Sequence, residues 1–277
     1  MSEQPVASPP ASPIANSHLE LPDLRRAHWR LVYRHVVLNR RSWLLFSTGF
    51  FEPVFYLLSI GLGVAILAGQ MTLPSGRPVS YQEFVAPAML AAAAMNGALM
   101  EVTFNCVFRM RYSKLYDSIL ATPMRPWDVA RGEVTWALLR GGIYSAGFLA
   151  VMVALGLGRS WWTVMALPAT LLIGYCFAGI GLWAGTLMRG WQDFDLLQIL
   201  ILPLFLFSGT FYPLSAYPPW LADLVVWTPL AQGVALTRGL TTGDPGPLMV
   251  INVVYLFALG SLGLFLASRR VTRVLQP

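Results

Sequence analysis

The feature that most constrains this 277-residue chain is a set of long segments that carry no charged side chain. A helix needs about 20 mostly apolar residues to cross the hydrocarbon core of a bilayer. Segments close to that length or longer occupy residues 53–76, 84–100, 141–158, 160–188, 196–222 and 245–268. They predict an all-α polytopic membrane protein with six transmembrane helices, at about 43–68, 84–107, 134–157, 162–187, 194–212 and 247–267.

The placement of positive charge gives the orientation of these spans. Sixteen of the nineteen Lys and Arg residues flank the predicted spans on one side, and only Arg77, Arg159 and Arg238 fall on the other. By the positive-inside rule, both termini are expected in the cytoplasm. The net charge of +6 is therefore a signal of topology. We expect no nucleic-acid partner.

The N-terminal region divides into a tail and a helix. Residues 1–20 lack the apolar core of a signal peptide and are rich in Pro, Ser and Ala, which predicts a disordered tail. In residues 21–42, Arg26, Arg30 and Arg34 recur every four residues and so share one helical face. We interpret this segment as an interfacial amphipathic helix with its arginines toward lipid phosphates or the cytoplasm. The alternative is a positive flank that only fixes topology.

The largest predicted cytoplasmic loop, 109–131, contains a helical pattern. Its apolar residues Tyr112, Leu115, Tyr116 and Ile119 have i, i+3, i+4, i+7 spacing, which predicts a short amphipathic helix at about 112–121. Thr122-Pro123 ends it, because the residue before proline disfavours the α conformation. A second helix is expected from Pro126 into the third span. The loop helix at 112–121 either docks a soluble partner or only connects two spans. Composition does not decide between these two roles.

Ionisable residues inside the predicted spans are the next candidates for function. Charges within a bilayer are costly and are usually paired or face a cavity. Glu101, near the cytoplasmic end of the second span, and Arg140, near the start of the third, should lie at similar depth and form a pair. Glu133 and Arg109 are alternative partners nearer the surface. We favour a structural role for Glu101, whereas Glu52 in the first span fits a structural or a transport role equally well.

Catalytic and cofactor motifs are missing from the sequence. The three histidines, His18, His28 and His35, all precede the first span, and no HExxH, paired CxxC or GxSxG pattern occurs. The chain has one lysine, Lys114, and its context excludes the phosphate-binding sequence GxxxxGK[ST]. We therefore expect no catalytic residue, metal or cofactor on this chain. If ATP drives its action, a separate subunit must hydrolyse the ATP.

The stretch 207–220, FSGTFYPLSAYPPW, should break the fifth helix. Prolines are poorly tolerated in helix interiors, and tyrosine and tryptophan rings settle at membrane interfaces. We expect the chain to leave the span near Gly209, turn at the prolines and form short helices at about 219–226 and 229–240. The residues expected to cap the outer end of the membrane domain are Gly209, Phe211, Tyr212, Pro213, Pro218 and Trp220.

Three segments carry a resemblance to a known family: 51–64 (FEPVFYLLSIGLGV), 100–140 around the first cytoplasmic loop, and 202–240, which contains SGTFYPLS. In their order and spacing, the chain resembles the permeases of type-2 ABC exporters (ABC-2). The likeness is greatest to the nodulation-factor (NodJ-type) and daunorubicin-resistance (DrrB-type) permeases.

The resemblance implies a six-helix membrane domain at 43–268, with a connecting helix at 21–42 and a cytoplasmic tail at 269–277. An extracellular re-entrant helical hairpin would separate spans five and six. A second permease, either a copy or a paralogue, and two cytoplasmic ABC ATPase subunits that bind ATP and Mg²⁺ would complete the complex in a bacterial inner membrane. The loop helix would be the coupling helix, which docks on the ATPase through Tyr112, Leu115, Tyr116, Ile119 and Leu120.

Substrates implied by the resemblance are lipid-linked sugars, glycolipids, polysaccharides, membrane lipids or amphiphilic drugs, moved outward. Two other classes of function remain open from the residues alone. One is a membrane-embedded scaffold, and the other is a lipid-modifying enzyme without ATP coupling. The shortage of acid, base and metal-binding residues argues against the enzyme, and a P-loop ATPase bound to the chain would exclude both.

Overall fold

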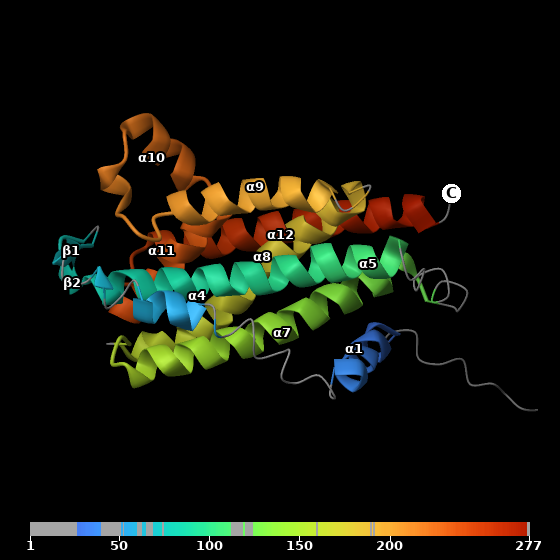
Figure 1. The fold of residues 1–277 in the computed structure, drawn as a ribbon, viewed down its shortest axis with the longest axis horizontal. Helices are drawn as coiled ribbons and strands as arrows, with labels where there is room; N and C mark the ends of the chain where they lie inside the picture. Colours follow the sequence, from blue (N-terminus) through green and yellow to red (C-terminus); the bar gives the residue numbers. More distant parts are fainter. Residues whose placement is uncertain are drawn as a thin grey trace, which may run out of the picture.

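The protein is a bundle of long helices capped at one end by short helices and a small β-hairpin (Figure 1). The computed structural model describes residues 27–39, 51, 53–59, 63–64, 69–73, 75–111, 119, 124–158, 160–188, 190 and 192–275. The predicted tail at 1–20 and most of the predicted first span lie outside these residues.

In the described part of the chain, two short helices and two strands precede the long helices, and most of the later residues are helical. In chain order the elements are α1 (Ala27–Asn39), β1 (Gln70–Thr72), β2 (Pro78–Ser80), α4 (Tyr81–Met100), the π-helix η4 (Glu101–Asn105), α5 (Cys106–Arg111), α7 (Pro126–Ala154), the 3-10 helix η5 (Trp161–Met165), α8 (Ala166–Leu187), α9 (Gln192–Phe207), the 3-10 helix η6 (Leu214–Ala216), α10 (Pro219–Val226), α11 (Pro229–Thr242) and α12 (Leu248–Leu275). Residues 53–59 are also helical.

Four helical stretches are long and apolar enough to cross a membrane: Tyr81–Arg109, Trp127–Ala154, Trp161–Leu187 and Leu248–Arg270. They coincide with the predicted second, third, fourth and sixth spans. The predicted fifth span corresponds to α9, which at 16 residues is shorter than the 194–212 expected. The first span, 43–68, falls mainly outside the described residues.

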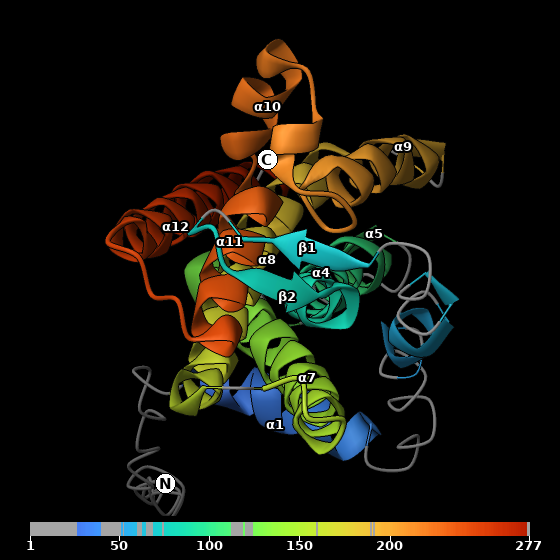
Figure 2. The same ribbon diagram turned by 90° about the vertical axis from the view of Figure 1, so that its left-hand side faces the viewer.

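Helix α4 forms the centre of the bundle, between α7, α8 and α11 (Figure 2). Ser80 and Glu83 begin it with a reciprocal capping box, in which the Ser80 amide donates to the Glu83 carboxylate at 2.9 Å. Its residues 91–94 are consecutive alanines, and all are buried. Small side chains let three neighbouring helices approach one central helix closely, as helix association in a membrane requires.

Helices α8 and α12 cross at glycines. A Cβ atom added to Gly263 of α12 would lie 2.6 Å from the carbonyl carbon of Gly179 in α8. A Cβ on Gly260 would lie 2.9 Å from the Cα of Cys176. Both separations are too short for a real side chain, so the two backbones touch directly. This crossing depends on glycine at both positions.

The all-α prediction is wrong in one place, because β1 and β2 form a two-stranded antiparallel hairpin before α4. The register pairs Gln70 with Ser80 and Met71 with Val79. The turn closes through Gly76, whose φ of 83° suits glycine. Only three residues pair in each strand. A segment this short does not produce a period-2 pattern strong enough to separate it from a loop.

The structure adds detail at two predicted boundaries. Residues 269–277 are expected as a cytoplasmic tail, and within that segment α12 continues without a break to Leu275. Arginine is a good helix former, and positive charge stabilises a helix C-terminus, so the basic residues after the apolar run extend the helix. The helix expected from Pro126 into the third span is α7, which begins at Pro126. It ends at Ala154, three residues before the expected 157, and Gly156 then adopts a φ of 73°.

Candidate functional site

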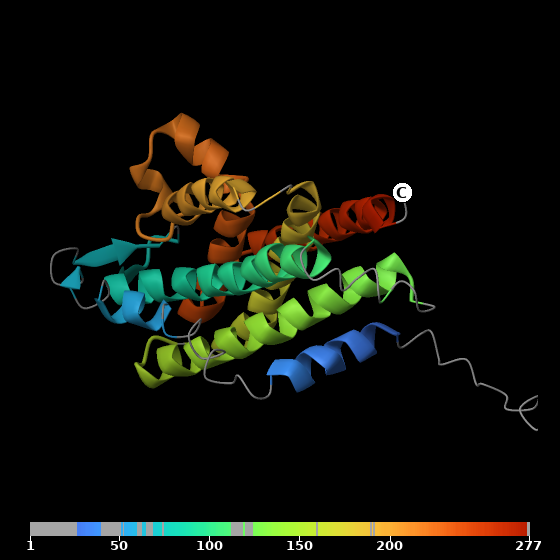
Figure 3. The ribbon, with the colours of Figure 1, turned by 45° about the vertical axis from the view of Figure 1, so that its right-hand side comes forward.

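A buried ion-pair network joins side chains of α1, η4, α5 and α7. Figure 3 shows α5 and the start of α7 at the same end of the bundle. The carboxylate of Glu101 is 1% exposed and accepts from two guanidinium groups. Its Oε2 lies 2.5 Å from Nη1 of Arg140, and its Oε1 lies 2.7 Å from Nη2 of Arg109. The predicted contact between Glu101 and Arg140 is therefore present, and Arg109 joins it.

Glu133 of α7 extends the network to α1. Its Oε2 accepts from Nη1 of Arg109 at 2.5 Å, and its Oε1 lies 3.2 Å from Nε2 of His35. At the other end, Nε of Arg140 donates to the hydroxyl of Tyr144 at 2.9 Å. A chain of charged and polar groups thus connects α1, η4, α5 and α7. Each buried charge has at least one opposite charge, as burial requires.

His35 is the member of the network that sequence reasoning missed. The three histidines precede the first apolar segment, and for that reason no site is predicted at them from the sequence. The sequence signal that could have identified His35 is its spacing, because it lies one helical turn after Leu31 and both residues are buried against α7. The imidazole ring of His35 also stacks on the Trp136 ring, with the two ring centroids 5.3 Å apart.

The π-helix η4 presents Glu101 to its partners. A π-turn inserts one extra residue into a helix and rotates the face that follows it, and such turns often occur at functional positions. Asn105, at the other end of η4, donates from Nδ2 to Oε2 of Glu101 at 2.6 Å. Three donors therefore hold one carboxylate, which makes the network a rigid brace between helices. No group of three His, Cys, Asp or Glu side chains suited to a metal occurs within the described residues.

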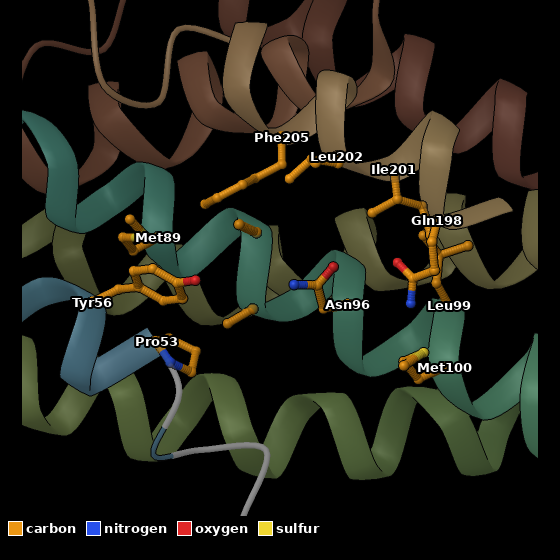
Figure 4. A pocket seen from close by; sticks show the side chains of 12 residues that line it. Pro53, Tyr56, Met89, Asn96, Leu99, Met100, Gln198, Ile201, Leu202 and Phe205 are labelled. Atoms are coloured by element: carbon orange, nitrogen blue, oxygen red, sulfur yellow. The ribbon is translucent and has the colours of Figure 1, made fainter. Parts of the chain in front are cut away.

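A second candidate is a cavity of about 240 Å³ between α4, α9 and the helical residues 53–59 (Figure 4). Most of its wall is apolar and includes Met89, Ile201 and Phe205. The side chains of Asn96 on α4 and Gln198 on α9 project into the space between the two helices. Neither amide has a hydrogen-bond partner within the described part of the chain. An apolar cavity with a few unsatisfied amides suits an amphiphilic ligand.

Helix α9 borders this cavity from the periphery of the bundle (Figures 1 and 2). None of its residues is buried, and most of its exposed side chains are apolar; the polar ones are Gln192, Asp195 and Gln198. The large exposed apolar residues of the helix are Leu196, Ile199, Leu200, Leu202, Leu206 and Phe207. The helix therefore presents an apolar surface that the rest of this chain does not cover. This surface extends to either side of the cavity and can contact lipid or another membrane chain.

The segment after α9 breaks where the sequence places the break. The helix ends at Phe207, and Gly209 takes a φ of 74° that favours glycine. Pro213 begins η6, and Pro218 precedes α10 (Pro219–Val226). Tyr212 and Trp220 are exposed, whereas Phe211 packs edge-on against Phe205 with centroids 5.4 Å apart.

Several predicted site residues lie outside the described part of the chain. They are Arg26, Glu52, Tyr112, Leu115, Tyr116 and Leu120. Of the predicted coupling helix, only Ile119 is described, and it packs against the main hydrophobic cluster. In α1, Arg30 is exposed and Arg34 is half-buried, while the outward face also carries the apolar residues Trp29, Tyr33, Val36, Val37 and Leu38.

Comparison with known proteins identifies the family. The family described as ABC-2 type transporter matches residues 26–242. Nodulation protein J of Rhizobium leguminosarum bv. trifolii is 29% identical over 195 residues, which are 70% of this chain and 72% of that protein. Nodulation protein J of Rhizobium meliloti is 26% identical over 227 residues, covering 82% and 85%.

A more distant relative is the probable multidrug ABC transporter permease YbhR of Escherichia coli. It is 24% identical over 185 residues, which are 64% of this chain and 48% of YbhR. The family match covers the ion-pair network, the cavity beside α9 and helices α10 and α11. The four apolar helices agree with a multi-pass membrane protein, and the family's members are transport subunits rather than enzymes. The chain belongs to the ABC-2 type transporter family and is a membrane permease similar to nodulation protein J.

Proposed function

We propose that this chain is the permease of an ATP-driven exporter that moves an amphiphile across a bacterial inner membrane. In this proposal the chain has six spans, of which residues 43–68 form the first, and both termini are cytoplasmic. The end with α1, α5 and the C-terminus faces the cytoplasm. The end with the β-hairpin and α10 then lies in the outer leaflet as a re-entrant hairpin.

The observation that carries the proposal is the cavity between α4 and α9. Its apolar wall suits an acyl chain or a flat apolar ring system, and the amides of Asn96 and Gln198 can bond to sugar hydroxyls or amide groups. Because α9 buries none of its residues, the cavity has an incomplete outer wall. A second permease, either another copy or a paralogue, would supply that wall and make the path an interface between two chains.

In this proposal, separate partner subunits supply the ATP hydrolysis. Two ABC ATPase subunits bind ATP and Mg²⁺, and the predicted helix at 112–121 docks on them. That loop connects α5 to α7, the two elements that Arg109 and Glu133 join. The ion-pair network would therefore transmit movement of the loop to both helices as one body. This chain itself would bind no cofactor.

The substrate class follows from the cavity rather than from any one relative. The name of nodulation protein J states no cargo, and that of YbhR states multidrug transport. The apolar wall and the two amides of the cavity fit a molecule with an apolar part and a polar part. We therefore propose a lipid-linked sugar, glycolipid or drug-like amphiphile.

Disulfide cross-linking in native membranes tests the shared path. Leu202 lines the cavity and is 58% exposed, so Leu202→Cys, made together with cysteine at the corresponding position when the second permease is a paralogue, should form a disulfide-linked adduct with the mass of two permeases. The native Cys106 and Cys176 are buried and should stay reduced. Leu171→Cys on α8, which is also exposed but lies away from the cavity, is the control. A Leu202→Cys chain that remains monomeric, or an adduct equally abundant for Leu171→Cys, would contradict the proposal.

A further inference from the structure

A second and larger cavity has a volume of about 560 Å³. The elements that line it include β1, α11 and the start of α4, which lie at the opposite end of the bundle from the C-terminus (Figure 1). The β1–β2 turn, the start of α4, the segment after α9, α11 and the start of α12 enclose it. Its apolar walls include Phe84, Leu214, Val234 and Leu248. The ion-pair network and the cavity beside α9 do not share any lining residue with it.

Arg238 of α11 is the cation of this cavity. Its Nε donates to the carbonyl of Phe84 at 3.1 Å, and its Nη2 donates to the carbonyl of Gly209 at 2.7 Å. The guanidinium carbon lies 3.7 Å from the centroid of the Phe84 ring. These acceptors are uncharged. In the described part of the chain, no carboxylate forms an ion pair with Arg238, and Nη1 has no hydrogen-bond acceptor.

Three further polar side chains, those of Thr242, Asp244 and Asn252, line the same cavity. The Thr242 hydroxyl donates to the carbonyl of Arg238 at 2.8 Å, and the Thr242 carbonyl accepts from Arg77 of the β1–β2 turn. Asn252 of α12 is 8% exposed, and its amide is unpartnered within the described residues. Asp244 also lines the cavity without an ion pair to either arginine. Of the three arginines that the charge count assigns to this side of the membrane, Arg238 lines the cavity and Arg77 is bonded to Thr242 of its wall.

We propose that this cavity binds the phosphate of an amphiphile. Arginine pairs with phosphate through planar, charge-assisted hydrogen bonds, and a guanidinium without a counter-charge at membrane depth requires one. The phosphate would accept from Nη1 of Arg238 and from the Asn252 amide. Asp244 would accept from a hydroxyl or ammonium of the head group, and the acyl part would lie against Leu214 and Leu248. This inference does not depend on the proposed export path, because a resident membrane lipid would occupy the same site.

Native mass spectrometry of the full-length chain, purified in detergent and stripped of lipid, tests the site. We expect phosphatidylglycerol to bind and diacylglycerol, which has the same chains without phosphate, not to bind. The variant Arg238→Gln should weaken phosphatidylglycerol binding about tenfold or more, the effect of losing one charge-assisted hydrogen bond. Arg269→Gln is the matched control, since Arg269 also stacks on a phenylalanine ring, that of Phe265 at 4.3 Å, but at the other end of the bundle.

Arg238 also joins α11 to α4 and to the segment after α9, so a second variant covers the case in which Arg238→Gln does not fold. The variant Ala235→Trp then decides, because Ala235 is an exposed lining residue and a large ring there fills the cavity while the guanidinium remains. Unchanged phosphatidylglycerol binding by a folded Arg238→Gln or Ala235→Trp chain overturns the proposal, as does equal binding of diacylglycerol. Inorganic phosphate separates two sources of the ligand: competition with phosphatidylglycerol indicates a small phosphorylated solute, and no competition indicates a lipid.

Discussion

At the scale of single residues, the membrane domain holds its charges in two different ways. Glu101 and Glu133 neutralise Arg109 and Arg140 in a closed network with all four side chains at least partly buried. Arg238, in contrast, bonds only to carbonyl groups within the described residues. A closed network resists change and suits a mechanical brace. A charge without a counter-ion attracts a ligand, so only the second arrangement is expected to bind one.

Glu101→Gln tests the brace. The variant keeps the shape of the side chain but leaves two buried guanidiniums with one carboxylate between them, a loss of about 3–5 kcal/mol for a broken buried pair. We expect a clear fall in the thermal unfolding midpoint of the purified chain in detergent micelles. Asp223→Asn, at an exposed position of α10, should leave the midpoint unchanged. Equal midpoints for the two variants would show that the network contributes no stability.

The same network makes a second prediction about coupling between residues. Removing both partners at once, as in Glu101→Gln with Arg140→Gln, leaves fewer uncompensated charges than the sum of the single changes implies. The double variant should therefore be more stable than additivity predicts, by about 1 kcal/mol or more. A double-variant cycle by thermal unfolding measures this difference. Strict additivity would mean that Arg140 stabilises the fold without acting through Glu101.

At the scale of elements, backbone contact between α8 and α12 fixes the helix packing. The variant Gly263→Val adds a branched side chain where even a Cβ atom lies 2.6 Å from the backbone of Gly179. Overpacking of this kind costs about 1–3 kcal/mol or more. We expect much less folded protein on size-exclusion chromatography. Gly190→Ala is the control, because an added Cβ there meets no atom within 4 Å. A normal profile for Gly263→Val would contradict the direct contact.

The predicted coupling helix gives a prediction at the same scale. Leu115→Asp places a charge on the apolar face that we expect to dock on the ATPase, so the ATPase should no longer co-purify with the chain. Ser118→Asp adds the same charge away from the centre of that face and should preserve the complex. Affinity purification followed by mass spectrometry gives the readout. Retention of the ATPase by Leu115→Asp would move the docking surface elsewhere.

The sequence predicts the elements of this molecule better than their contacts. Charge-free length identifies α4, α7, α8 and α12, and the prolines and Gly209 identify the break after α9, because both signals are local. The short β-hairpin and the helical C-terminus were missed, since their stability depends on neighbours rather than on pattern. His35 and Arg238 were missed for a related reason: their partners are 98 and 154 residues away in the chain.

At the scale of the whole molecule, the two ends of the bundle differ in composition and in expected role. The end with the ion-pair network adjoins the loop proposed for ATPase docking, and the end with the β-hairpin, α10 and α11 encloses the cavity of Arg238 (Figure 1). The cavity beside α9 lies along the side of the bundle. This arrangement matches a permease that receives movement at one end, holds cargo at its side and contacts lipid head groups at the other end.

The claim that this chain is the permease of an ATP-driven complex is tested most directly by the composition and the ATPase activity of the complex isolated from native membranes. The account predicts that the tagged chain co-purifies with a P-loop ATPase and a second permease, in equal numbers of permease and ATPase subunits. The preparation should hydrolyse Mg-ATP, and Leu115→Asp should abolish that hydrolysis in the purified material. A chain that purifies alone from gently solubilised membranes, or a complex without Mg-ATP hydrolysis, would contradict the account.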